Sequence, residues 1–295
     1  MALEGSDASM AGTVTLGGEL QVRRLGFGAM RITGAGIWGP PDDPARAVAV
    51  LRRAVELGVN FIDTADSYGP EVSEELIAEA LHPYPGGLVI ATKGGLTRSG
   101  PGRWERDGRP EHLREACEGS LRRLRVEHID VYQLHAVDPE VPLEESVGAL
   151  ALLRNEGKIG HVGLSNVGLE ELERAREIVP VVSVQDRFGL AHRDSDPVVE
   201  RCESDGLPFI PWFPLDAGRL ANGDGDAAPT ASPIDRIAEA HDATPFQIAI
   251  AWLLARSPVM LPIPGTSSVE HLEQNVAAAG LQLSEAELGE LSAAA

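Results

Sequence analysis

Short apolar runs alternate with amphipathic helical stretches eight times along this 295-residue chain. Strands that alternate with helices in this way form parallel sheets, because each right-handed crossover carries the chain back over one face of the sheet. The pattern therefore limits the chain to two architectures, a doubly wound sheet and a (β/α)8 barrel. The eight predicted strands are Leu25–Ala29, Phe61–Ile62, Leu88–Thr92, Ile129–Leu134, Val162–Leu164, Val181–Val184, Phe209–Trp212 and Val259–Ile263.

Capping residues mark the boundaries of several predicted helices. Asp43-Pro44 provides an N-cap and a first-turn proline before a helix at Ala45–Leu57. Thr244-Pro245 does the same before Phe246–Ala255. A third helix is predicted at Glu144–Asn155, because a glycine stop follows it.

The first predicted strand favours the barrel over the doubly wound sheet. A doubly wound nucleotide-binding sheet usually has G-x-G-x-x-G after its first strand. Here residues 26–31 read G-F-G-A-M-R, so the third glycine is missing. We therefore predict a disordered N-terminus at residues 1–12 and a single α/β domain, a (β/α)8 TIM barrel, at residues 13–295. Thr13–Leu16 and Glu19–Val22, joined by Gly17-Gly18, predict a two-residue-turn hairpin that plugs the N-terminal end of the barrel.

Charge and composition exclude several functional classes. The chain has 25 basic and 45 acidic residues and a formal net charge of −20, whereas nucleic-acid binding needs clustered cations. Its longest apolar run, Ile248–Ala255, is far shorter than the roughly 20 residues that cross a bilayer. Cys117 and Cys202 are too few for a disulfide framework, and the histidines lack metal-ligand spacing. With no secretory signal visible, we expect a cytoplasmic monomer that binds neither nucleic acid, membrane nor metal.

Polar side chains follow consecutive predicted strands, at the end of a barrel where catalytic sites lie. Asp63 and Tyr68 follow the second strand, Lys93 the third and His135 the fourth. Taken singly, the Asp is usually a cap, and the Tyr and His are usually structural. A lysine at the end of a buried strand needs a partner, however, and Asp63 on the neighbouring strand is the natural one.

This arrangement predicts a proton donor. A cation at Lys93 would favour the phenolate of Tyr68 and lower the pKa of that side chain from about 10. A tyrosine tuned in this way is a general acid near neutral pH. His135 would then donate a hydrogen bond that orients a substrate carbonyl.

From about Thr15 to Leu291 the chain resembles the aldo-keto reductases, in particular the bacterial branch that includes pyridoxal reductases. The catalytic tetrad of that family maps onto Asp63, Tyr68, Lys93 and His135, with the Asp-to-Tyr spacing intact. Residues 163–166 (G-L-S-N) match a second family segment, and residues 263–268 (I-P-G-T-S-S) match the loop that binds the adenosine phosphate.

The resemblance implies a nicotinamide cofactor and a small-molecule carbonyl substrate. Gln185 would hold the nicotinamide carboxamide, and Trp212 would stack on the ring where relatives have tyrosine. Trp38 and Trp104 are predicted walls of the substrate pocket. The complete predicted cofactor set is Ala29, Met30, Asp63, Ser165, Asn166, Gln185, Trp212, Phe213, Leu215, Gly218, Pro264, Gly265, Thr266, Ser267, His271, Gln274 and Asn275.

The phosphate loop departs from the family pattern. Many relatives have Lys or Arg in or just after this loop, in contact with the 2′-phosphate of NADPH, whereas here the nearest basic residue is His271. Hydroxyls and amides at a helix N-terminus still bind phosphate, but charge-assisted contacts are roughly twice as strong. We therefore expect NADPH as the cofactor, with a modest preference over NADH.

The resemblance leaves two functions open. The first is reduction of an aldehyde or ketone to an alcohol, with Tyr68 as the proton donor and pyridoxal among the candidate substrates. The second is a non-enzymatic regulatory subunit of the potassium-channel β type, which shares the fold and the cofactor site. An exposed apolar patch would favour the second, and the sequence suggests none.

Overall fold

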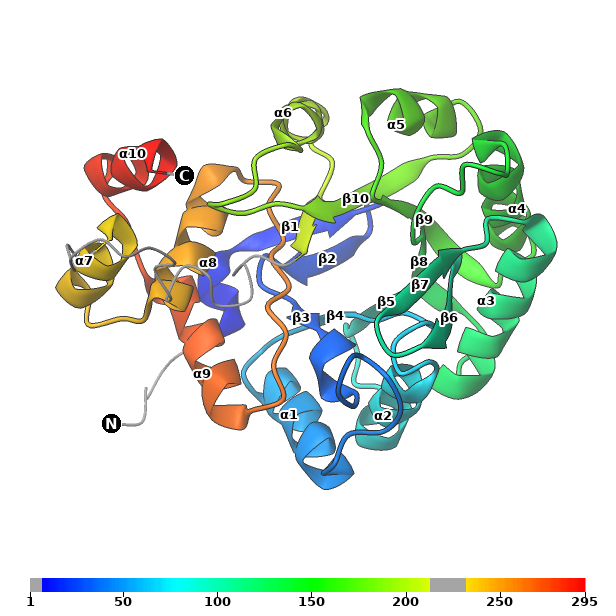
Figure 1. Ribbon diagram of the computed structural model, residues 1–295, viewed down its shortest axis with the longest axis horizontal. Helices are drawn as coiled ribbons and strands as arrows, with labels where there is room; N and C mark the ends of the chain where they lie inside the picture. Colours follow the sequence, from blue (N-terminus) through cyan, green and yellow to red (C-terminus); the bar gives the residue numbers. More distant parts are fainter. Residues whose placement is uncertain (1–6, 213–231, 295) are drawn as a thin grey trace.

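The computed structural model describes residues 7–212 and 232–294 (Figure 1). Seven strands form one curled parallel sheet in the order β11-β10-β9-β8-β5-β4-β3. Every strand pairs with the neighbour expected for a barrel. The strands are β3 (Phe27–Gly28), β4 (Phe61–Asp63), β5 (Val89–Gly94), β8 (Ile129–Leu134), β9 (Ile159–Ser165), β10 (Val181–Arg187) and β11 (Phe209–Trp212).

The eighth predicted strand, Val259–Ile263, is an extended segment rather than a strand of the sheet. It still bridges the two edges of the sheet. The Phe209 carbonyl accepts from the Leu261 N–H at 2.8 Å, and the Gly26 N–H donates to the Pro262 carbonyl at 3.0 Å. Proline has no N–H, so Pro262 and Pro264 interrupt the ladder. The predicted strand is wrong as an element, but the segment closes the (β/α)8 barrel as expected.

Helices surround the sheet (Figure 1). Three predicted helices are confirmed to within one residue: α1 (Pro44–Glu56), α4 (Leu143–Asn155) and α8 (Pro245–Arg256). Asp43 caps α1 by accepting from the Arg46 N–H, as its sequence predicts. The others are α2 (Val72–Leu81), α3 (Pro110–Leu124), α5 (Leu169–Arg176), α6 (Asp196–Asp205), α7 (Pro233–Ala240), α9 (Val269–Ala277) and α10 (Glu285–Ala293).

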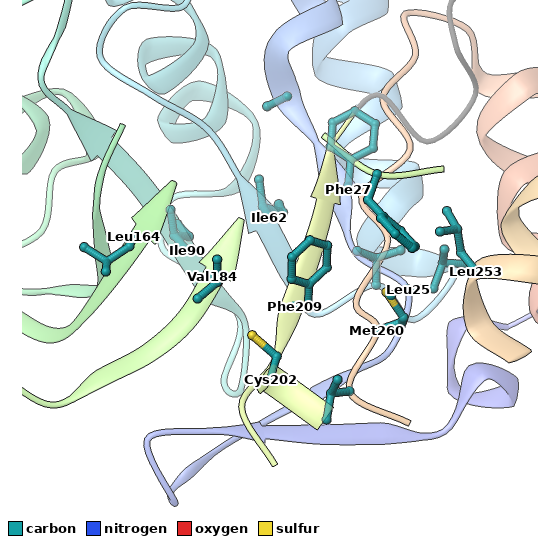
Figure 2. Close-up of a cluster of buried hydrophobic side chains, with 14 of the residues drawn as sticks. Leu25, Phe27, Ile62, Ile90, Leu164, Val184, Cys202, Phe209, Leu253 and Met260 are labelled. Atoms are coloured by element: carbon teal, nitrogen blue, oxygen red, sulfur yellow. The ribbon is translucent and has the colours of Figure 1, made fainter. Parts of the chain in front are cut away.

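Two apolar clusters hold the barrel together. The larger one lies between strands and helices, and Figure 2 shows Leu25, Phe209 and Met260 gathered beside Leu253 of α8. The smaller one fills the barrel interior, where alternate residues of each strand point inward. Its buried members are Leu16, Val22, Phe61, Val89, Ala91, Val131, Val182, Ile210, Leu261 and Ile263.

The N-terminal hairpin plugs the barrel, as predicted. Leu16 of β1 (Thr13–Leu16) and Val22 of β2 (Leu20–Arg23) are fully buried members of the interior cluster. The second strand begins at Leu20, one residue later than predicted, because the pairing register starts at Leu16 and Leu20. Gly17 and its neighbour Gly18 both have positive φ, which glycine adopts without strain.

Of the N-terminal segment that the sequence predicts to be disordered, the structure describes residues 7–12, and residues 1–6 lie outside the described part. Ala8–Ala11 form a short 3₁₀ helix (η1). Asp7 caps it by accepting from the Ser9 N–H at 2.7 Å, and the Ala8 N–H donates to the Leu57 carbonyl at 2.9 Å. A local cap and a bond to the end of α1 therefore fix the segment.

A second hairpin follows β5 and was not predicted. It consists of β6 (Leu96–Gly100) and β7 (Arg103–Arg106), which pair antiparallel outside the barrel sheet. It lies at the carboxyl end of the strands, over the predicted site. In the ranges that the structure describes, no helix is long and apolar enough to span a membrane.

Candidate active site

Lys93 is the centre of the polar cluster at the carboxyl end of the sheet. Its ammonium donates to Asp63 Oδ2 at 2.6 Å and to the Thr64 carbonyl at 2.8 Å. It also lies 3.5 Å from the Tyr68 hydroxyl. Both charged side chains are buried, so each depends on the other for charge compensation. β4 and β5 are neighbours in the sheet, which is why Asp63 and Lys93 meet.

Two glutamines fix the other oxygen of the Asp63 carboxylate. Gln133 of β8 donates to Oδ1 at 3.0 Å, and Gln185 of β10 donates to the same atom at 2.8 Å. Sequence reasoning missed Gln133, and it assigned Gln185 only to the cofactor. A signal existed for Gln133, because it alternates with His135 and so points to the same side of the sheet. The result is a carboxylate whose orientation is fixed through both of its oxygens.

The environment of Tyr68 differs from the sequence prediction in its electrostatics. Burial raises the pKa of the Tyr68 hydroxyl above its usual value, and the carboxylate of Asp63 acts in the same direction. Lys93 opposes this rise without overcoming it. The predicted lowering of the Tyr68 pKa is therefore wrong, since the argument omitted the cost of burying a phenolate. In this state Tyr68 is a protonated phenol beside an ammonium.

The raised pKa of Tyr68 predicts that the rate of the reaction does not depend on pH near neutrality. If Tyr68 is the proton donor that the sequence predicts, kcat/KM should stay level between about pH 6 and pH 9, because Tyr68 keeps its proton below its raised pKa. The donor is lost only as the pH rises through that pKa, so the alkaline limb lies above about pH 10. Steady-state rates at substrate concentrations well below KM measure it. A limb centred near about pH 7.5 would assign the proton to another group.

His135 lies beside Tyr68, with the two rings edge to face and their centroids 5.8 Å apart. Burial holds the pKa of His135 well below its usual value, and the nearby Lys93 adds to this effect. The imidazole is therefore neutral at pH 7. Its Nδ1 lies 3.3 Å from Ser67 Oγ, which fixes the orientation of the ring.

Asn166 connects His135 to the far side of the site. Its amide donates to the His135 carbonyl at 2.8 Å, and its side-chain oxygen accepts from the indole N–H of Trp212 at 3.1 Å. Its φ of 56° lies in the left-handed region, which asparagine tolerates better than most residues. These hydrogen bonds connect the end of β9 to the ends of β8 and β11.

A cavity of about 920 Å³ opens above this cluster. It lies within the size range of small-molecule and cofactor sites, about 300–1,000 Å³. Tyr68 and His135 line it, whereas the buried Lys93 lies behind them. Of the predicted cofactor set, the cavity is lined by Met30, Asp63, Ser165, Asn166, Gln185, Trp212, Pro264, Gly265, Thr266, His271, Gln274 and Asn275.

The remaining predicted residues fall elsewhere. Ala29 is fully buried and does not line the cavity. Ser267 lines a second hollow of about 510 Å³ beside the first. Phe213, Leu215 and Gly218 lie outside the described residues.

The two predicted substrate residues differ in their placement. Trp104 lines the cavity, and its ring centroid lies 6.4 Å from that of Tyr68. Trp38 does not line it, and instead forms a backbone bridge with Gly69. Sequence reasoning missed further lining residues, because they come from distant segments with no shared motif. These include Arg31, Ile37, Leu96, Thr244, Pro245 and Phe246.

Gly28 and Gly265 meet where the barrel closes beside the cavity. A Cβ on Gly265 would lie 2.4 Å from the Gly28 carbonyl oxygen, so no side chain fits there without movement. The same Cβ would lie 3.7 Å from Cγ of Arg31, which lines both hollows. The loop at residues 263–268 thus has no cation of its own, but the exposed Arg31, which is distant in sequence, lies against it.

Comparisons with known proteins agree with this geometry. The sequence model of the aldo/keto reductase family matches residues 24–295. The chain is 52% identical to an uncharacterized oxidoreductase of Schizosaccharomyces pombe, over 94% of this chain and 88% of the other. It is 42% identical to pyridoxine 4-dehydrogenase of Escherichia coli, over 95% and 96% of the two chains.

Solved structures agree as well. The glycerol dehydrogenase of Gluconobacter oxydans superposes with a TM-score of 0.85 at 27% identity, covering 96% of this chain and 95% of that one. An aldo/keto reductase of Klebsiella pneumoniae in complex with NADP and acetate gives a TM-score of 0.77 at 30% identity, covering 95% and 93%. The tetrad geometry, the barrel and these matches lead to one conclusion: the chain is an oxidoreductase that belongs to the aldo/keto reductase family.

Proposed function

We propose that this enzyme reduces an aldehyde or ketone to an alcohol with a reduced nicotinamide dinucleotide as the cofactor. The observation that carries the proposal is the Tyr68 hydroxyl, which lines the cavity and lies 3.5 Å from a buried ammonium. Three relatives support it by their names: the S. pombe protein is an oxidoreductase, and the E. coli and G. oxydans proteins are dehydrogenases. No observation favours the regulatory-subunit alternative.

The lining of the cavity fits a dinucleotide. Ser165, Asn166 and Gln185 provide amide and hydroxyl groups at the deep end, near Tyr68, and Trp212 provides a flat ring beside them. At the other end, Thr266 and the loop before α9 provide a hydroxyl and backbone amides, which suit a phosphate. When bound at the deep end, the reduced nicotinamide supplies a hydride to the carbonyl carbon.

The residues of this chain supply the proton and the orientation. Tyr68 donates its phenolic proton to the carbonyl oxygen as the alcohol forms. The Lys93 ammonium stabilises the phenolate that is left, and Asp63 holds that ammonium in place. The neutral imidazole of His135 keeps one N–H, which donates a hydrogen bond to the carbonyl oxygen and sets its direction.

A substrate screen tests this function. Pyridoxal, methylglyoxal and aryl aldehydes are each mixed with enzyme and either reduced cofactor, and loss of the reduced-nicotinamide absorbance is followed. Pyridoxal is the first choice, because the E. coli relative is named a pyridoxine 4-dehydrogenase. We expect aldehyde-dependent cofactor oxidation that stops when the aldehyde is consumed. Tight cofactor binding without turnover of any carbonyl would instead support a regulatory role.

We further propose NADPH as the preferred cofactor, by less than about 100-fold over NADH. The support is Arg31, whose stem lies beside Gly265 in the loop that the resemblance assigns to the adenosine phosphate. Arg31 is exposed and has no ion pair in the described ranges, so its guanidinium is available to a phosphate. An exposed contact of this kind is worth less than a buried one, which is why the expected preference is modest.

Substitution of Arg31 tests the cofactor proposal. We expect Arg31→Ala to weaken NADPH binding about three- to tenfold and NADH binding less than twofold, because only NADPH has the 2′-phosphate. Conversely, Ser267→Arg should tighten NADPH much more than NADH. Fluorescence titration of both cofactors measures this. Arg46→Ala, an exposed arginine on α1, is the matched control. Equal loss for both cofactors would place Arg31 at a phosphate that they share.

A further inference from the structure

Trp104 forms a wall of the cavity next to the proton donor. The β6–β7 hairpin carries it there, and its indole is edge to face with Tyr68 at an interplanar angle of 86°. Its centroid also lies 6.3 Å from that of His135. Trp104 is 38% exposed and belongs to a hairpin outside the barrel sheet, so neither burial nor the barrel fixes its position. Another group must hold it.

Arg98, on the strand that pairs with that of Trp104, is that group. Its guanidinium lies over the indole at 3.7 Å from the ring centroid, and it lies 5.8 Å from the ring of Trp38. A planar cation stacks on an aromatic face at this distance. Arg98 therefore contacts two tryptophans, Trp104 on β7 and Trp38 in the loop after β3.

All five N–H donors of Arg98 are used. Within its own hairpin, Nε donates to the Arg103 carbonyl at 3.0 Å and Nη2 to the Gly100 carbonyl at 3.5 Å. Toward the loop after β3, Nη1 donates to the Ile37 carbonyl at 2.9 Å and Nη2 to the Gly36 carbonyl at 3.0 Å. The remaining bond, from Nη1, reaches the Ser67 carbonyl at 3.2 Å, one residue before the tyrosine.

These bonds join three segments that line or support the cavity. The loop at Gly36 and Ile37 has positive φ at both residues, and for the branched Ile37 this conformation is unfavourable. The hydrogen bonds from Arg98 to both carbonyls stabilise this unfavourable backbone conformation. Only a guanidinium has five donors in one plane, and a lysine has three donors on a single atom.

We propose that Arg98 is a positioning residue that locks Trp104 and Ile37 into a rigid wall, and that this wall selects flat, aromatic carbonyl substrates over small aliphatic ones. The inference rests on the proposed carbonyl reduction. Its basis is the set of perpendicular rings at Trp104, Tyr68 and His135, together with apolar Ile37 and Leu96 in the same lining. The ring of an aromatic substrate is stabilised by edge-to-face contacts with these side chains, whereas a short alkyl chain makes no such contacts.

The test compares two substrates on the same enzyme preparation. kcat/KM is measured for benzaldehyde and for propionaldehyde with wild type, Arg98→Ala, Arg98→Lys and the control Arg106→Ala, an exposed arginine of the same hairpin. We expect both Arg98 variants to lower the benzaldehyde-to-propionaldehyde ratio about five- to tenfold, mainly through KM for benzaldehyde. The control should leave the ratio unchanged. Partial unfolding lowers both rates equally and does not move a ratio.

Two other outcomes are decisive. If Arg98→Lys keeps the wild-type ratio, a positive charge is sufficient and the five-bond lock is wrong. If Arg98→Ala lowers kcat/KM equally for both substrates while the protein stays folded, Arg98 has no role in selecting between them. Failure of the proposed function looks different, because wild type itself would then oxidise cofactor with neither aldehyde.

Discussion

Tyr68→Phe is expected to lower kcat for carbonyl reduction by about 10²- to 10⁴-fold, the usual contribution of a general acid. The substitution removes one oxygen atom and leaves the ring in its packing against Trp104 and His135. Lys93 keeps its bonds to Asp63 and to the Thr64 carbonyl, so the pocket retains its charge compensation. Cofactor binding should therefore stay within about twofold of wild type.

Two measurements make this result interpretable. Single-turnover rates show whether the loss lies in the chemical step, and a fluorescence titration shows whether the cofactor still binds. Tyr132→Phe is a matched control, since Tyr132 is also a buried tyrosine of the barrel but does not line the cavity. If Tyr68→Phe keeps more than about half of the wild-type single-turnover rate, Tyr68 is not the proton donor.

The approximate position of the site was predictable from the sequence because a parallel barrel imposes it. Once the strand ends were located, residues such as Asp63 and Lys93 had to lie close together, since all strands of the barrel point the same way. The spacing of short apolar runs was sufficient for this step. An error of one or two residues in a strand boundary does not move a strand end to the other side of the barrel.

The sign of the Tyr68 pKa shift was not predictable in the same way. It depends on a balance between burial, the Lys93 ammonium and the Asp63 carboxylate, and only the structure gives the depth of burial. The sequence predicts the pairing of Asp63 with Lys93, but a lysine that is already paired has less influence on a third group such as Tyr68.

Contacts between distant segments were also beyond the sequence. Arg31 meets Gly265 only because the barrel closes, and nothing in either local segment marks the meeting. Arg98 was overlooked for the opposite reason, since its partners are backbone carbonyls, which have no sequence signature. The eighth strand was overpredicted because an apolar run was weighed without Pro262, which removes a ladder donor.

Lys93→Met is expected to be as inactive as Tyr68→Phe, and the double variant should be little worse than either one. Tyr68 and Lys93 act as one unit, because the phenolate left after proton donation is stabilised by the ammonium 3.5 Å away. Losses from residues that act together do not multiply. Single-turnover rates of the two single variants and the double variant give the coupling directly. Losses that multiplied would mean that Lys93 contributes independently of Tyr68.

Lys93→Met also has a cost in stability, which has to be separated from the loss of activity. Removing one partner of a buried ion pair leaves Asp63 uncompensated, and such changes cost about 3–5 kcal/mol. Two glutamine amides still donate to Oδ1, but Oδ2 loses its only side-chain partner in the described ranges. Lys93→Met with Asp63→Asn should therefore recover much of the lost stability, because it removes the uncompensated charge, while activity stays absent. Denaturant unfolding of wild type, Lys93→Met and the double variant measures the change in stability. If the Asp63→Asn exchange restored activity as well, the loss in Lys93→Met would come from misfolding, and the ammonium would have no part in the chemistry.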